Sequence, residues 1–206
     1  MKLHFNPASP FVRMVRVTAH EAGVADQIEI VATGAVSPVE VHEGVAADNP
    51  LGKIPCLVTD HGQPLFDARV ICEYLAHHGG HGELYPREPV KRFRVLTVQA
   101  LAHGIADAAV LHRYETAMRP EELRWDVFAE RQLTRIDDAL DALEGRWSRD
   151  LGEVTAGTVA TACALSYLDF RFAERAWRKA RPQLAAFYET FARRPSMTAS
   201  ELANPT

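Results

Sequence analysis

A glycine- and proline-rich stretch at residues 79–88 divides this sequence into two parts with different patterns. Glycine and proline at such density between periodic segments indicate a linker. Strand and helix patterns alternate before it, whereas only helical patterns follow it. The 206 residues leave room for two small domains, because a typical domain holds about 150 residues. We therefore expect an α/β domain over 1–78, a linker over 79–88 and an all-helical domain over 89–206.

The first part predicts a strand, a helix and a second strand, followed later by a hairpin and a helix. Ser9-Pro10 is typical of a helix start, because serine is a leading N-cap residue and proline fits the first helical position. Gly23 ends this helix, and the helix after the hairpin covers about Val70–His77. Residues 33–48 predict a loop with a short helix. The expected strands are Leu3–Phe5, Gln27–Val31, Cys56–Thr59 and Pro64–Phe66.

Apolar spacing in the second part predicts four helices. They run from about Phe93 to Met118, through Leu123–Leu143, through Val159–Leu168 and over Pro182–Phe191. The third is apolar on nearly every side, so we expect it at the centre of its domain. The residues after Ser196 show no period.

Charge and cysteine usage exclude several classes of protein. A net charge of -4 and a pI near 6.1 argue against a nucleic-acid binder, which usually has a pI above about 9. No apolar run approaches the roughly 20 residues of a membrane span, and the N-terminus lacks the apolar core of a signal peptide. Cys56, Cys72 and Cys163 form no CxxC pair, which predicts a reduced, cytoplasmic protein with buried, packing cysteines. The scattered histidines predict no metal site.

Two polar residues stand where a predicted strand gives way to a predicted helix. At such a junction, Ser9 lies beside unpaired backbone N–H groups and the positive end of a helix dipole, a place that stabilises an anion such as a thiolate. Asp67 can bind a ligand ammonium there, with the N–H of Ala68 taking a carboxylate. The alternative is that both residues only cap their helices.

The segment Asn49-Pro50-Leu51-Gly52-Lys53-Ile54-Pro55 runs straight into a predicted strand. Proline is tolerated at a strand start. A cis bond before Pro55 would turn a main-chain edge toward a ligand, although only about 5–6% of X–Pro bonds are cis.

The order and spacing of these segments resemble the cytosolic glutathione S-transferases, particularly bacterial members that begin with a strand and then Ser-Pro-[Phe/Tyr]-Val-Arg. The matching segments are 8–13, 49–55, 67–71, 102–109 and 162–171, and the resemblance covers the chain to about Pro195. It implies a thioredoxin-like α/β domain followed by an all-α helical bundle that contributes the pocket for an electrophile. It also implies a homodimer, with glutathione as cosubstrate and no metal.

The resemblance assigns roles to individual residues. Ser9 would be the catalytic residue, which donates a hydrogen bond to the glutathione sulfur. Ile54 would pair its backbone with the cysteinyl part, and Asp67 with the Ala68 N–H would hold the γ-glutamyl end. The residues implied to bind glutathione are Phe11, Lys53, Ile54, Pro55, Asp67 and Ala68. The implied activity is that of a transferase, in which the glutathione thiolate attacks a small hydrophobic electrophile.

Two positions depart from the family pattern, and two other functions remain open. Ala68 stands where the family usually has serine, which predicts weaker glutathione binding. Thr158 replaces the aspartate of a helix-capping box, a change that we expect to cost about 1 kcal/mol. A non-catalytic glutathione-binding or interaction module is one alternative. The other, a glutathione-dependent thiol–disulfide oxidoreductase, needs a cysteine where Ser9 stands. No motif encodes the electrophile, so conjugation, dehalogenation, isomerisation and peroxide reduction all stay open.

Overall fold

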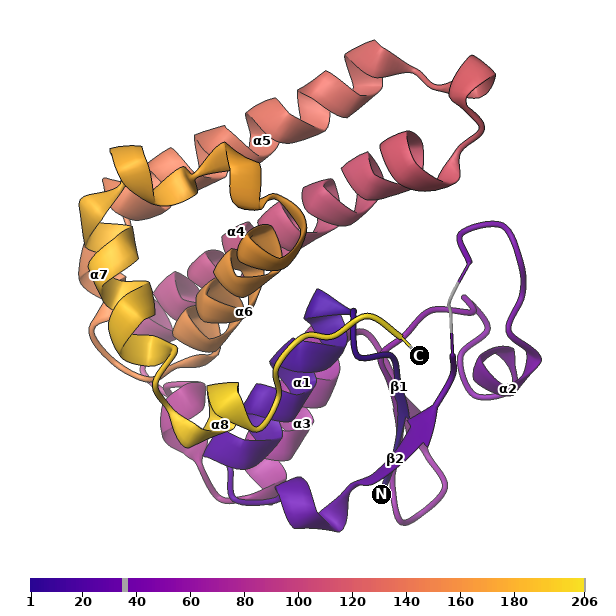
Figure 1. Cartoon of the computed structure of the whole chain (residues 1–206). Coiled ribbons are helices and arrows are strands. Elements are labelled where there is room, and N and C mark those ends of the chain that lie inside the picture. Colours follow the sequence, from indigo (N-terminus) through magenta and orange to yellow (C-terminus); the bar gives the residue numbers. More distant parts are fainter. Residues whose placement is uncertain (35–36, 206) are drawn as a thin grey trace. The chain divides into compact units, whose positions relative to one another are not determined.

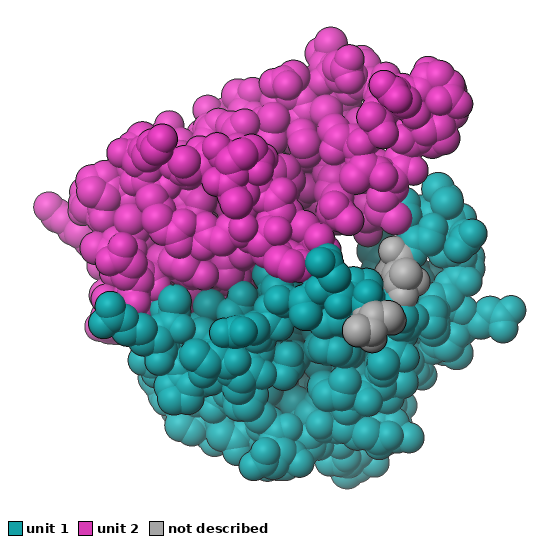
Figure 2. Space-filling view, in the orientation of Figure 1, with its two compact units in different colours: residues 1–89, 192–206 teal, residues 90–191 magenta. Residues whose placement is uncertain are grey.

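The computed structural model describes residues 1–34 and 37–205, and the chain forms two compact units (Figures 1 and 2). Unit 1 holds residues 1–89 together with those from 192 onward, and unit 2 holds residues 90–191. The sequence assigned the C-terminal residues to the helical domain, whereas the structure groups them with unit 1. The physical reason is pairing with the first helix, where both Glu21 carboxylate oxygens accept from the Arg194 guanidinium at 2.7 Å.

Unit 1 is built on a four-stranded mixed sheet with the order β2-β1-β3-β4. β1 runs parallel to β2 and antiparallel to β3, and β4 is antiparallel to β3. Helices α1 and α3 pack against each other, as Figure 1 shows. This is the thioredoxin-like arrangement expected from the sequence. The elements are β1 (Lys2–Phe5), α1 (Pro10–Glu21), β2 (Glu29–Ala32), α2 (Glu43–Ala46), β3 (Cys56–Val58), β4 (Pro64–Leu65), α3 (Ala68–His78) and α8 (Pro195–Thr198).

The local signals for α1 are confirmed by the structure. Ser9 caps the helix, with its Oγ accepting a hydrogen bond from the Val12 N–H at 3.2 Å. Gly23, which follows the helix end, has a φ of 66°, a backbone conformation that glycine adopts without steric cost. The expected strand over Gln27–Val31 is shifted instead. Residues Ala25–Gln27 form a 3-10 turn, and β2 begins at Glu29 because its pairing with β1 begins there.

The regular elements described in unit 2 are all helical. They are α4 (Pro89–Arg113, whose first residue belongs to unit 1), a π-helical turn (Tyr114–Met118), α5 (Asp126–Glu144), α6 (Ala156–Arg171) and α7 (Pro182–Phe191), with short 3-10 turns at Glu121–Leu123, Ser148–Leu151, Ala173–Arg175 and Trp177–Ala180. Every residue of α6 from Ala156 to Leu168 is buried, which confirms the central helix. One run, Pro89–Met118, is long and apolar enough to cross a membrane by length and composition, contrary to the expectation from the sequence, but the core helix of a soluble protein meets the same criteria.

The second helix of unit 2 begins later than the apolar spacing predicted. Leu123 is exposed and lies in a 3-10 turn, and α5 begins at Asp126. The backbone N–H of Trp125, just before α5, donates to Glu115 Oε1 at 2.7 Å. A side chain from the preceding π-helical turn therefore binds the backbone just before α5 begins.

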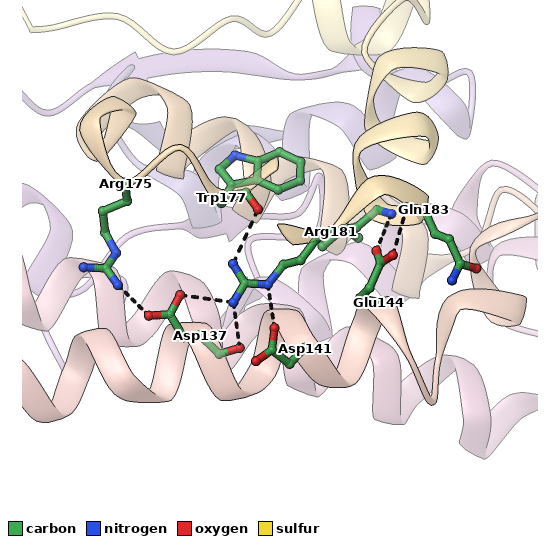
Figure 3. Close-up of polar contacts among 8 residues, drawn as sticks. Asp137, Asp141, Glu144, Arg175, Trp177, Arg181 and Gln183 are labelled. Atoms are coloured by element: carbon green, nitrogen blue, oxygen red, sulfur yellow. Dashed lines mark hydrogen bonds and ion pairs between the residues drawn. The ribbon is translucent and has the colours of Figure 1, made fainter. Parts of the chain in front are cut away.

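Polar side chains on α5 bind the start of α7 (Figure 3). The buried Arg181 guanidinium donates to Asp141 Oδ1 at 2.8 Å and to Asp137 Oδ1 at 3.2 Å. Glu144 accepts hydrogen bonds from the backbone N–H groups of Gln183 and Leu184, at 3.0 and 2.8 Å. These first-turn N–H groups have no partner inside a helix. The last residue of α5 therefore caps α7.

The helix-capping box at the start of α6 is complete, contrary to the cost expected from the missing aspartate. Thr155 Oγ1 accepts from the Thr158 N–H at 3.3 Å, and Thr158 Oγ1 accepts from the Thr155 N–H at 2.8 Å. The Thr158 hydroxyl also donates to the Glu153 carbonyl at 2.9 Å. A threonine hydroxyl can replace the carboxylate here because it accepts one hydrogen bond and donates another.

We predict that Thr158→Val lowers the free energy of unfolding by about 1–3 kcal/mol, because it leaves the buried Thr155 N–H without its acceptor. Thr161→Val is the matched control. Thr161 is also fully buried, but its hydroxyl donates only to the Gly157 carbonyl within the same helix, so its loss should cost less than about 0.5 kcal/mol. Urea unfolding of both variants measures the difference, and equal losses would show that the box contributes nothing particular.

Candidate functional site

Three chain segments singled out from the sequence leave the sheet of unit 1 at the same end. His4 pairs with Cys56, so the end of β1 lies beside the start of β3. Leu65 pairs with Leu57, so the end of β4 lies there too. The segments that carry Ser9, Ile54-Pro55 and Asp67 follow or precede these strand ends directly. The sheet therefore brings the three predicted ligand-binding segments to one edge.

Both long helices of unit 1 begin at this edge, and each has a polar N-cap. Ser9 is half-buried and caps α1, and Asp67 is exposed and caps α3, with its Oδ1 accepting from the Arg69 N–H at 2.9 Å. The N-terminus of each helix directs the positive end of its dipole toward this edge. This edge is therefore suited to a ligand with negative groups.

The turn that carries Ser9 is held from within by Asn6. Asn6 Oδ1 accepts from the Ala8 N–H at 2.9 Å, and the Asn6 carbonyl accepts from the Ser9 N–H at 3.2 Å. The Asn6 amide also donates to the Gly34 carbonyl. Within the described part of the chain, the Ser9 hydroxyl acts only as the acceptor for Val12, so its own proton is available for a ligand. Asn6 was not among the residues predicted from the sequence, and its signal is an asparagine at the first position of a turn, where the side chain binds the backbone two residues on.

The loop that precedes β3 is organised by a second asparagine, Asn49, which is almost fully buried. Its amide donates to the Lys53 carbonyl at 2.7 Å, and its Oδ1 accepts from the Leu51 N–H at 3.1 Å. The Ile54–Pro55 bond is cis, as the resemblance implied. Lys53 is exposed and Ile54 is half-buried. Asn49 was part of the quoted motif but had no role assigned to it.

Asp67 is already engaged by a neighbouring cation. Its Oδ2 lies 2.9 Å from Arg69 Nη2, and this hydrogen-bonded contact raises the pKa of Arg69. Both side chains are about half exposed, so the pair is accessible to a ligand. Ala68 is the first residue of α3, and its methyl group is buried. Phe11 lies half-buried in the first turn of α1.

The cysteines lie away from solvent. Cys56, Cys72 and Cys163 are all free thiols and all buried, which confirms them as packing residues. Burial, with a contribution from the charge of Asp48, raises the pKa of the Cys56 thiol to about 11. A thiol with so high a pKa is almost entirely protonated at neutral pH. In the described ranges, 1–34 and 37–205, no three His, Cys, Asp or Glu side chains gather as metal ligands would.

Comparisons with known proteins agree with this arrangement. Residues 8–78 match the family described as glutathione S-transferase, N-terminal domain, and residues 126–190 match glutathione S-transferase, C-terminal domain. The uncharacterized GST-like protein YibF of Escherichia coli (strain K12) is 35% identical over 206 residues, which cover 98% of each chain.

Solved structures show the same similarity. A glutathione transferase family member from Pseudomonas fluorescens Pf-5, with bound glutathione, is 43% identical and superposes with a TM-score of 0.94, covering 100% of this chain and 99% of its own. Another structure of such a member from this organism, with bound S-(propanoic acid)-glutathione, is 42% identical with a TM-score of 0.89, covering 100% of both chains. The fold, both domain matches and a relative similar over its full length lead to one conclusion: the chain belongs to the glutathione S-transferase family.

Proposed function

We propose that this protein is a serine-type glutathione transferase, in which Ser9 holds bound glutathione as its thiolate. The observation that carries the proposal is the Ser9 hydroxyl at the start of α1, whose proton is free to donate while its oxygen caps the helix. The family membership and the glutathione bound in similar structures support it.

The energetics of one hydrogen bond are sufficient for this role. A free thiol with a pKa of about 8.5 is only about 3% ionised at pH 7. A charge-assisted hydrogen bond contributes about 1.5–3 kcal/mol, and one pKa unit corresponds to about 1.4 kcal/mol. A hydroxyl that donates to the thiolate but not to the thiol therefore lowers the thiol pKa by roughly one to two units. The N–H groups at the start of α1 act in the same direction.

The thiolate sulfur then attacks an electrophilic carbon, so that an S–C bond forms while a leaving group departs with its electron pair or a double bond takes up the electrons. The S-(propanoic acid)-glutathione bound in one similar structure is a molecule with such an S–C bond. Conjugation is therefore the reaction that we propose, with a small hydrophobic electrophile as the second substrate.

The other segments at the sheet edge would bind the rest of the tripeptide. The backbone of Ile54, exposed by the cis bond to Pro55, suits the cysteinyl part, and Lys53 suits a carboxylate. Asp67 suits the γ-glutamyl ammonium, while the Ala68 N–H suits its carboxylate. Phe11 contributes contact area in the first turn of α1.

A thiol–disulfide oxidoreductase is disfavoured by the cysteines themselves. Such chemistry needs an accessible thiolate, but Cys56, which directly follows Pro55, is buried and has a raised pKa. A binding module without catalysis is the second candidate, and the observation that favours it is Ala68 in place of the usual serine. Turnover of chlorodinitrobenzene with glutathione distinguishes a transferase from a binding module.

We predict that Ser9→Ala raises the pKa of bound glutathione by about one to two units, because the thiolate loses its hydrogen bond. At pH 7 the thiolate fraction and kcat/KM should fall, and the loss should shrink as the pH rises above the new pKa. Thiolate absorbance of the complex against pH measures this. Ser9→Thr, which keeps both the cap and the hydroxyl, is the control. An unchanged pKa with binding intact would mean that Ser9 is only a cap.

A second prediction concerns the γ-glutamyl end. Ala68→Ser should tighten glutathione binding about threefold to thirtyfold, since a hydroxyl adds a hydrogen bond to the carboxylate and water already supplies part of it. The thiol pKa should hardly change, because position 68 is remote from the sulfur. Calorimetric titration measures both affinities. Arg69→Ala is the matched variant. If Ala68→Ser and the parent bind glutathione with equal affinity while Arg69→Ala binds it weakly, Arg69 already makes the contact with the γ-glutamyl carboxylate.

We also predict a homodimer, as the family resemblance implied. Each unit exposes large apolar side chains of the kind that a second copy would cover, among them Leu51 and Val70 in unit 1 and Val90 and Phe93 in unit 2. Light scattering at micromolar concentration should give twice the chain mass of 22.9 kDa. A mass of one chain under these conditions would contradict the prediction.

A further inference from the structure

The residues that end unit 1 run along α1 to the turn that carries Ser9. Residues 195–205, here called the strap, comprise α8 and the segment after it, and Figure 1 shows this segment passing over α1 toward the end of β1. This course could not be predicted from the sequence, because the residues after Ser196 have no periodic pattern.

Two arginines of α1 fix the first part of the strap. The buried Arg13 donates from Nη2 to the Met197 carbonyl at 3.0 Å, and Arg16 donates from Nη2 to the Ala199 carbonyl at 2.7 Å. Both carbonyls lie at the end of α8, where the Met197 carbonyl also accepts from the Ser200 N–H at 3.4 Å. The Arg16 guanidinium also lies 5.4 Å from the centre of the Phe5 ring, at the end of β1.

One further hydrogen bond joins the strap to the Ser9 turn. The Ala203 N–H donates to the Pro7 carbonyl at 3.2 Å. Pro7 lies inside the turn that the Ser9 N–H closes on the Asn6 carbonyl, also at 3.2 Å. Asn6 thus holds the turn from within, and the strap holds it from outside.

We propose that the strap is a positioning element for Ser9, which keeps the turn of residues 6–9 in the geometry that directs the hydroxyl at the glutathione sulfur. This inference rests on the proposed function, because it concerns the thiolate that Ser9 stabilises. Hydrogen bonds weaken steeply when their angle falls, so a turn that moves loses much of the effect of its hydroxyl. Ala203, Arg13 and Arg16 act through the turn and do not touch the substrate.

The test removes the strap N–H that donates to the Pro7 carbonyl, in two ways. Ala203→Pro lacks this donor, and a chain that ends at Leu202 lacks residue 203 altogether. The matched controls are Ala203→Gly and a chain that ends at Asn204, which both keep the Ala203 position with its N–H. Thermal unfolding establishes that each variant is folded. The readouts are thiolate absorbance against pH with bound glutathione, and hydrogen exchange of the Ala8 and Ser9 amides.

We expect both N–H-deficient variants to raise the pKa of bound glutathione by about 0.5–1 unit, which from a starting pKa of about 6.5–7.5 is about 1.5- to eightfold less thiolate at pH 7. Exchange of the Ala8 and Ser9 amides should become about tenfold faster, and the controls should match the parent. Ser9→Ala in the same titration distinguishes the two proposals. If Ser9→Ala raises the pKa and the strap variants do not, the strap inference is wrong and the proposed function stands.

Two other outcomes are also decisive. Unchanged exchange at Ala8 and Ser9 would overturn the positioning role, whatever the activity. If Ser9→Ala leaves the pKa unchanged, the proposed role of Ser9 fails, and with it the effect of the strap on the thiol.

Discussion

The backbone N–H groups at the start of α1 have no acceptors within the helix, and the architecture of unit 1 follows from how the chain meets this requirement. Ser9 satisfies one of them from a turn that Asn6 closes. Because β1 leads into this turn and pairs with β3, the cis bond before Pro55 lies at the same end of the sheet. The second helix start, at Asp67, arrives there through β4. An edge that is suited to a ligand with negative groups is thus a consequence of two helix starts that share one end of a sheet.

Local signals predicted the parts of the fold that depend on neighbouring residues. Ser9 and Gly23 marked α1 correctly, because a cap and a left-handed glycine act within one turn of the chain. The central position of α6 was also predicted, since a helix that is apolar all round has no face for solvent. The bounds of β2 were not, because pairing with β1 sets them and its own sequence does not.

The features that the sequence did not reveal are side chains that bind the backbone of distant or irregular segments. Asn49 and Asn6 hold loops through amide groups, and hydropathy patterns carry no trace of such bonds. The guanidinium of Arg13 reaches a carbonyl 184 residues away. At Thr158 the prediction erred in the other direction. The family pattern suggested that the capping box lacks an acceptor for the Thr155 N–H, but the Thr158 hydroxyl supplies it. Residue types alone therefore identified the helix caps better than the residues that support the loops around them.

The division of unit 1 into two stretches of sequence has a consequence for synthesis. Glu21 and Arg194 are 173 residues apart, and all of unit 2 lies between them in the chain. At roughly 5–20 residues per second, a ribosome needs about 10–35 s to make that interval. Throughout this time, Glu21 and the side of α1 that carries Arg13 lack the C-terminal residues that cover them in the folded unit. Unit 1 is therefore completed only after all of unit 2 has been synthesised.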